Sequence, residues 1–194
     1  VNDLMDKGNA LLLEISKAKR MRNEILAPLP NPEMSTSEQM NLSHQLIKQI
    51  DQSYLEAFQY YKKAADQGNA SAQLNLGDLY SNGDGVIKSE IEAAKWYKLA
   101  ADQGDAKGQY YLGLMYRSGD GVIQNDYEAV RLYKLAADQG DAMALYELGF
   151  MYENGYGVTQ SDTEAIKYYK VMEGKGKDAK YLAKLRIKEI KNKE

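Results

Sequence analysis

The five residues Ala-Ala-Asp-Gln-Gly occur three times in this chain, at 64–68, 100–104 and 136–140. The copies are 36 residues apart in both intervals, since 104 − 68 and 140 − 104 give the same number. A fixed spacing of this size is the sequence signature of a repeat protein, in which one structural unit is copied along the chain. The fold therefore depends on what one such unit forms.

Each unit contains two segments of helical periodicity separated by a glycine-rich loop. Ala72, Leu76 and Tyr80 are four residues apart, so they fall on one face of a first helix, which the Gly-x-Gly at 83–85 ends. Residues 93–104 repeat the spacing and end in glycine, which predicts a second helix. A single hairpin of this kind cannot cover its own apolar face. Neighbouring units must stack, and the predicted fold is an all-α α/α solenoid.

The repeated pattern resembles the Sel1-like repeat, a relative of the tetratricopeptide repeat. It reads Ala-x-x-x-Leu-Gly-x-x-Tyr-x-x-Gly-x-Gly-Val, then Ala-x-x-x-Tyr-x-x-Ala-Ala-x-x-Gly, and covers residues 70–174. The resemblance implies a right-handed superhelix of helix-turn-helix repeats whose first helices line a concave groove. It also implies a protein-binding role, since such proteins commonly act as adaptors in bacterial and eukaryotic pathways.

The two ends of the chain depart from the repeat. The prolines within 27–32 predict a rigid turn between a helix over about 2–26 and a long helix that starts at Ser35, where Glu38 completes a capping box. We expect one continuous solenoid domain with three parts. These are an elongated N-terminal hairpin ending in a repeat-type helix (1–68), three Sel1-like repeats (69–176) and a basic C-terminal capping helix (177–194).

Composition excludes several classes of function. The formal charge of −3 and the pI near 5.4 give no overall reason to expect a nucleic-acid partner. The absence of cysteine excludes disulfides and thiolate metal sites. No apolar run approaches the roughly 20 residues of a membrane span, so membrane insertion is not expected.

The first residue is Val1 rather than methionine, so a natural start has been removed. If a secretory signal was lost with it, the protein is expected in the bacterial periplasm or outside the cell. Otherwise the protein is expected in the cytoplasm.

Chemically active residues do not form a recognisable catalytic set. His44 has no second histidine or cysteine with which to share a metal. The glycine-rich loops are better explained by positive φ at a helix end, because Tyr156 replaces the aspartate of the third loop. Pairs such as Asp102/Asp105 are expected to cap helices. We therefore predict no catalytic residues, no metal and no cofactor, and a protein that is not an enzyme.

Positions that differ between repeats are released from packing and are the predicted partner-binding site. In the first helix of each unit they follow the spacing i, i+4, i+7, i+11, which places them on one stripe. Several are large and apolar although the repeat does not require it. The predicted binding residues are Asn75, Asp78, Lys107, Tyr111, Leu114, Met143, Glu147, Phe150 and Asn154. The alternative is that this groove is covered by the chain's own terminal helix or by a second copy in a homodimer.

The sequence thus predicts a non-enzymatic scaffold that binds a partner protein in its concave groove. Two roles fit the family resemblance: a bacterial adaptor, and an immunity protein that neutralises a toxin or effector. The small size of the chain suits the second. The alternative from another class is a cell-wall-associated enzyme or glycan-binding protein.

Overall fold

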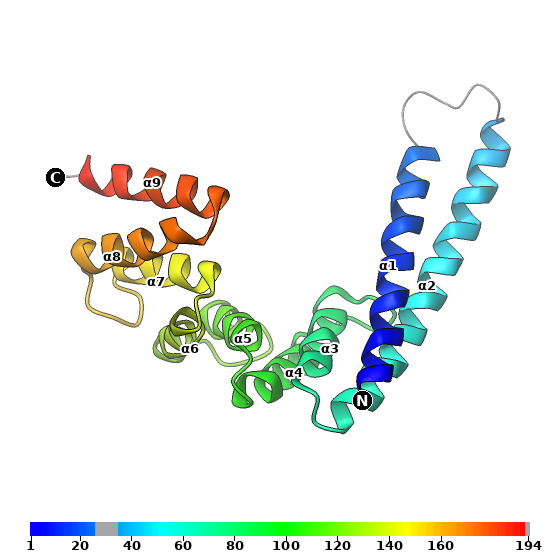
Figure 1. The fold of residues 1–194 in the computed structure, drawn as a ribbon, viewed down its shortest axis with the longest axis horizontal. Helices are drawn as coiled ribbons and strands as arrows, with labels where there is room; N and C mark the ends of the chain where they lie inside the picture. Colours follow the sequence, from blue (N-terminus) through cyan, green and yellow to red (C-terminus); the bar gives the residue numbers. More distant parts are fainter. Residues whose placement is uncertain (26–34, 193–194) are drawn as a thin grey trace. The chain divides into compact units, whose positions relative to one another are not determined.

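A computed structural model describes the fold of residues 1–25 and 35–192. These residues form nine α-helices, one short 3-10 helix and no strand (Figure 1). The all-α class predicted from the sequence is confirmed. The proline turn predicted at 27–32 lies outside the described residues. The chain divides into two compact units, Val1–Ser89 and Glu90–Glu194, and each is described by itself.

The first unit contains a long helical hairpin and one shorter helix: α1 (Asn2–Ile25), α2 (Thr36–Asp66) and α3 (Ala70–Asn82). Helices α1 and α2 lie side by side (Figure 1), and α3 packs against α2. The predicted capping box is confirmed, because the Glu38 backbone N–H donates to Ser35 Oγ and the Ser35 N–H donates to Glu38 Oε2 at 2.8 Å.

The second unit is a series of short helices in which each packs against the next. They are α4 (Glu90–Asp102), α5 (Ala106–Ser118), α6 (Asp126–Asp138), α7 (Ala142–Asn154), α8 (Asp162–Met172), the 3-10 helix η1 (Glu173–Lys175) and α9 (Lys177–Lys191). Helix α9 is the last helix of this unit, and its role as a cap stays a prediction. The side chain of its Arg186 is only 22% exposed and lies 2.6 Å from the Glu153 carboxylate.

Turn geometry explains the glycine-rich loops, as predicted. Gly83, Gly119 and Gly155 follow α3, α5 and α7 in the left-handed conformation, with φ of 77°, 82° and 72°. Only glycine adopts this conformation without steric cost. Their N–H groups donate to carbonyls of the preceding helix turn and so end each helix.

The predicted acidic caps are confirmed at two positions. Asp105 and Asp141 accept the N–H groups of Gly108 and Ala144 at 2.8 Å, at the starts of α5 and α7. The residue paired with Asp105, Asp102, is instead the last residue of α4, where it accepts from Lys98, and Asp138 is likewise the last residue of α6. The acidic pairs therefore serve two adjoining helix ends.

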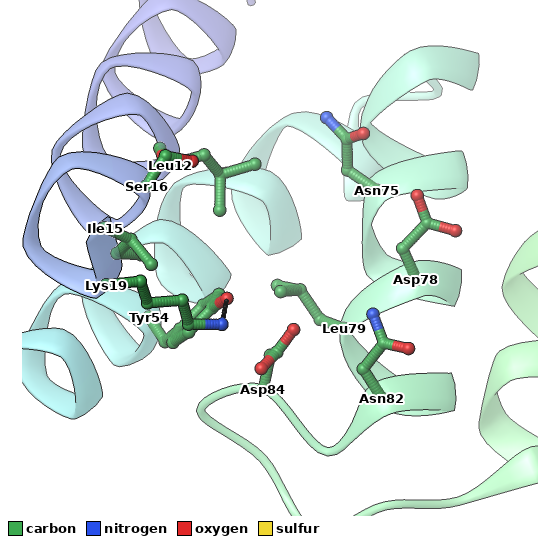
Figure 2. Close-up of a pocket in the computed structure, with 10 residues that line it drawn as sticks. All are labelled: Leu12, Ile15, Ser16, Lys19, Tyr54, Asn75, Asp78, Leu79, Asn82 and Asp84. Atoms are coloured by element: carbon green, nitrogen blue, oxygen red, sulfur yellow. Dashed lines mark hydrogen bonds between the residues drawn. The ribbon is translucent and has the colours of Figure 1, made fainter. Parts of the chain in front are cut away.

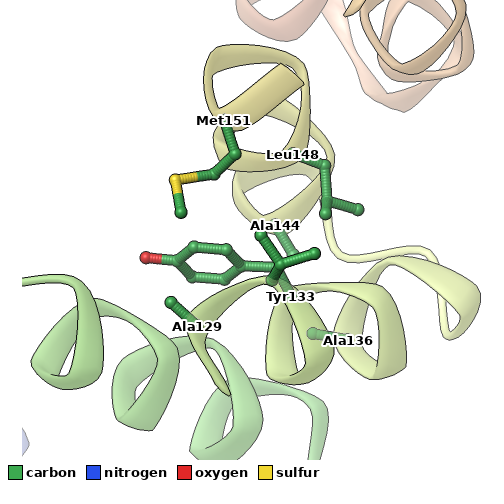
Figure 3. Packing of buried hydrophobic residues seen from close by; sticks show 7 residues of the cluster. Ala129, Tyr133, Ala136, Ala144, Leu148 and Met151 are labelled. Carbon is green, nitrogen blue, oxygen red and sulfur yellow. The ribbon is translucent and has the colours of Figure 1, made fainter. Parts of the chain in front are cut away.

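The core of the second unit is built on framework tyrosines. Figure 3 shows the Tyr133 ring between α6 and α7, among Ala129, Ala144, Leu148 and Met151. All five are less than 2% exposed. Burial of this kind provides the main stabilisation between neighbouring helices.

Glycines let these tyrosine rings approach the backbone of the neighbouring helix. A Cβ placed on Gly113 would lie 2.7 Å from the Tyr133 ring, and one on Gly149 would lie 2.4 Å from the Tyr169 ring. The same contact recurs in the first unit, where Gly8 would meet the Tyr61 ring at 2.6 Å. These distances leave no room for a side chain, so a glycine-on-tyrosine contact joins the two helices in each of these three pairs, α1 and α2, α5 and α6, and α7 and α8.

Candidate functional site

The variable stripe of the second unit lies on α5 and α7, and we call it the α5–α7 face. Of the predicted binding residues, Met143 is 48% exposed, and Lys107 and Asn154 are also exposed. Tyr111, Leu114 and Phe150 are half-buried. Leu114 packs against the Tyr133 cluster. The α5–α7 face therefore combines exposed side chains with apolar ones that are anchored in the core.

Arg117 holds the two helices of this face together. Its guanidinium extends from α5 and forms an ion pair with Glu147 of α7. The same guanidinium lies over the Phe150 ring, 5.5 Å from its centroid. A cation over an aromatic face is attracted by the ring quadrupole. Arg117 therefore fixes the positions of both α7 residues.

Glu147 is buried, with 7% of its surface exposed. Burial raises the pKa of its carboxyl above the ordinary value, and the charge and hydrogen bond of Arg117 oppose that rise in part. Burial likewise raises the pKa of the neighbouring Tyr110 to about 12. The buried carboxylate thus holds the Arg117 guanidinium in place. Glu147 itself offers little exposed surface to a partner.

Aromatic rings extend the face on both sides. Phe150 packs at 5.9 Å, centroid to centroid, against Tyr156 of the following loop. A pocket of about 170 Å³ opens beside this pair, lined by Arg117, Gln124, Asp126, Phe150 and Tyr156. Tyr111 stacks on the buried framework residue Tyr97 at 5.1 Å. Tyr111 therefore contributes to packing as well as to the surface.

The remaining two predicted residues, Asn75 and Asp78, line a pocket of about 290 Å³ in the first unit. Figure 2 shows this α1–α3 pocket, with α1 on one side and α3 and its following loop on the other. Its lining residues are Leu12, Ile15, Ser16, Lys19, Tyr54, Asn75, Asp78, Leu79, Asn82 and Asp84. The structure thus gives each unit a candidate site. That the two sites belong to one concave groove stays a prediction.

The residues matched by family comparison cover most of the chain. The Sel1 repeat model matches at 43–69, 70–105, 106–141 and 142–171. The chain belongs to the Sel1 repeat family. Proteins of this family generally act as protein-interaction scaffolds. A search of curated proteins finds no match.

Two solved structures of Sel1-type proteins resemble this one. A Sel1 repeat protein from Oxalobacter formigenes is 32% identical, with a TM-score of 0.65 over 93% of this chain and 72% of its own. The protein c5321, a protective antigen of uropathogenic Escherichia coli with an SLR fold, is 27% identical, with a TM-score of 0.66. That match covers 93% of this chain and 43% of c5321. The predicted α/α solenoid is therefore confirmed.

Sequence reasoning missed several residues of the α5–α7 face and of the α1–α3 pocket. Arg117 occupies a position that also varies between repeats, as Ser81 and Glu153, so its variability could have revealed it. Tyr156 was noticed only as a substitution in a loop. The α1 residues of the pocket in Figure 2 carry no repeat pattern, and nothing in the sequence pairs them with α3.

The described parts of the chain hold no helix suited to crossing a bilayer. Within the same residues, no group of three or more histidine, cysteine, aspartate or glutamate side chains is arranged to hold a metal ion.

Proposed function

We propose that this Sel1 repeat protein is a non-enzymatic scaffold that binds a partner protein through the α5–α7 face. The observation that carries the proposal is the cluster of Arg117, Phe150 and Tyr156, together with the exposed Met143 on the same helix as Phe150. Aromatic residues, arginine and methionine are enriched in the centres of protein interfaces. Each of them can contribute a large share of the binding free energy.

The contacts within the face support this role. Arg117 is already held by Glu147, and Phe150 lies between Arg117 and Tyr156. Side chains that are ordered before binding lose less conformational entropy when a partner docks. A pre-ordered aromatic anchor next to a small pocket suits an inserted apolar side chain of the partner.

We extend the proposal to two biological roles that use the same face. One is an adaptor in a bacterial pathway, and the other is an immunity protein that neutralises a toxin or effector. The bacterial origin of the two structural relatives supports a bacterial setting for both roles. The roles differ in the effect on the partner, because an immunity protein abolishes the activity of the protein it binds.

The test is affinity capture with the wild-type chain, followed by binding isotherms of a Met143→Ser/Phe150→Ser variant with the captured partner. Loss of one hot spot corresponds to about 2 kcal/mol or more, so we expect affinity to fall roughly thirtyfold or more. Tyr181→Ser is the matched control, since Tyr181 is an aromatic side chain that is 73% exposed on α9. A double variant that melts normally and keeps wild-type affinity would exclude the α5–α7 face as the site.

An activity assay of the captured partner then separates the two roles. Inhibition on binding favours an immunity protein, and unchanged activity favours an adaptor.

A further inference from the structure

We propose that α9 binds the surface of a membrane that carries anionic phospholipids. This goes beyond the proposed function, since it concerns another surface and another class of partner. The contact is made by five exposed lysines of α9, which we call the lysine face: Lys177, Lys180, Lys184, Lys188 and Lys191.

The five lysines lie on one flank of the helix. With 3.6 residues per turn, they fall within about 80° of one another around the helix axis. Tyr181 and Leu185 come next around the helix, and they are 73% and 42% exposed. Ala183 and Ile190 are buried in the core of the unit, so the apolar side of α9 is covered by protein. The lysine face therefore suits contact with a membrane surface and not insertion of the helix.

The charges of α9 are arranged differently from those of the repeat helices. In α4, α6 and α8 a basic side chain pairs with an acidic one three residues earlier. These pairs are Lys95–Glu92, Arg131–Glu128 and Lys167–Glu164. No side chain of the lysine face forms an ion pair with any residue whose position the structure describes. The protein itself therefore does not neutralise these five charges.

The lysines are also neighbours of one another. Lys180, Lys184 and Lys188 are four residues apart, a spacing at which like charges destabilise a helix. A cap that needs only a polar surface could use the mixed charges of α4, α6 and α8 and avoid this repulsion. Anionic headgroups in contact with the lysine face would remove it. The clustered like charges therefore favour an anionic partner over a face that is only solvated.

The acidic residues of α9 do not offset the cluster. Glu189 accepts from Arg186 at 2.7 Å, and Arg186 also pairs with Glu153. Residues 173–192 contain seven basic and three acidic residues, so their net charge is 7 − 3 = +4. Residues 90–172 contain eight and thirteen, which gives 8 − 13 = −5. An anionic surface would therefore attract the α9 end of the second unit and repel the rest.

The side-chain types favour a lipid surface over an acidic protein or a nucleic acid. All five charges come from lysine, and the one arginine of α9, Arg186, is engaged within the protein. Arginine is enriched and lysine depleted in protein interfaces, and arginine is also the commonest specific reader of bases. Lysine clusters attract anionic headgroups, and tyrosine rings lie at membrane–water interfaces. Tyr181 beside the lysine face fits this combination.

The test mixes the full chain with vesicles and measures the bound fraction by sedimentation. The vesicles contain phosphatidylcholine, either alone or with about 30% phosphatidylglycerol as the anionic lipid. We expect binding to the anionic vesicles only, and its loss when salt is raised from about 0.1 M to about 0.5 M. No binding to the anionic vesicles, or equal binding to both kinds, would overturn the proposal.

A triple variant tests the lysine face itself. Lys180→Gln/Lys184→Gln/Lys188→Gln should lower the partition coefficient roughly a hundredfold, about fivefold for each lysine. The three side chains are exposed, so the variant should keep the circular dichroism spectrum of the wild type. A folded triple variant that binds the anionic vesicles like the wild type would refute the assignment to α9.

The matched control removes the same number of charges elsewhere. Lys95→Gln/Lys98→Gln/Lys167→Gln replaces exposed lysines that have acidic partners, and it should bind nearly as well as the wild type. An equal loss in the two triple variants would show that total charge, and not the lysine face, determines binding.

A fluorescence reporter locates the contact without removing any charge. Tyr181→Trp should show a blue shift of its emission when anionic vesicles are added, and the wild type, whose one tryptophan is Trp96, should not. No shift in the vesicle-bound variant would place the contact elsewhere and refute the proposal. A random DNA duplex or polyglutamate that binds at least as tightly as the anionic vesicles would show that the assigned class of partner is wrong.

Discussion

Replacing Gly149 with alanine tests the glycine-on-tyrosine contact directly. In most helices this change stabilises the protein, because alanine has a helix propensity about 1 kcal/mol more favourable than that of glycine. Here the added methyl group would lie 2.4 Å from the nearest carbon of the Tyr169 ring. We expect the sign of the effect to be reversed.

The magnitude follows from the overlap. Carbon atoms in contact prefer a separation of about 3.5–4.0 Å, so the methyl group intrudes by roughly 1 Å or more. Tyr169 is fully buried, and its hydroxyl donates to Glu153 at 3.3 Å, so the ring cannot move without cost. Overpacking of this kind costs up to about 3 kcal/mol. After the gain in helix propensity, the net loss is about 2 kcal/mol.

Thermal unfolding followed by circular dichroism measures this loss. For a chain of this size, a net loss of about 2 kcal/mol lowers Tm by about 4 to 8 °C. Gly174→Ala is the control, because a Cβ at Gly174 meets nothing within 4 Å, and it should leave Tm nearly unchanged. A Gly149→Ala variant as stable as the wild type would refute the packing argument.

Two further predictions concern the same unit. Leu148→Ala should lower the free energy of unfolding by roughly 2 to 5 kcal/mol in a denaturant titration, since Leu148 is fully buried between α6 and α7; a loss under about 1 kcal/mol would contradict that placement. The pKa of Glu147 is raised in the folded state above its ordinary value of 4.5, so protonation of this carboxyl favours folding. The contribution of Glu147 to the free energy of unfolding is therefore largest in acid and declines as the pH rises through the raised pKa. Glu147→Gln should therefore melt at or above the wild-type temperature at pH 7, and the difference should shrink toward pH 4. A variant that is less stable than wild type at pH 7, by an amount that disappears in acid, would show that the ion pair with Arg117 dominates.

Much of the fold could be predicted because the 36-residue period fixes which residues are equivalent. The helix ends at Gly119 and Gly155 were predictable, since loss of the loop aspartate at Tyr156 left backbone conformation as the shared requirement. The capping box at Ser35 was predictable because its two residues are three apart in sequence. These features are local, and local sequence determines them.

The site was predicted less completely because burial and partners across helices are not local. Variation at position 147 identified a stripe residue, but only the structure shows its carboxylate buried beneath Arg117, 30 positions earlier. Tyr111 was expected to serve as a surface anchor, and the structure adds its stacking on Tyr97. Asp78 of the α1–α3 pocket lies in a repeat, so the sequence could identify it as a candidate. The opposite wall of the pocket comes from α1, which has no repeat pattern, so the sequence could not identify it.

The glycine-on-tyrosine contacts also bear on the order in which parts of the chain fold. Gly113 and Tyr133 are separated by 133 − 113 = 20 residues, as are Gly149 and Tyr169, whereas Gly8 and Tyr61 are separated by 61 − 8 = 53. For a flexible chain, closing the longer segment costs about 1 kcal/mol more in entropy. This corresponds to roughly a fivefold lower rate of forming that contact, if closure limits the rate. The short internal hairpins should therefore nucleate folding, and the long N-terminal hairpin should join a structure that has already formed.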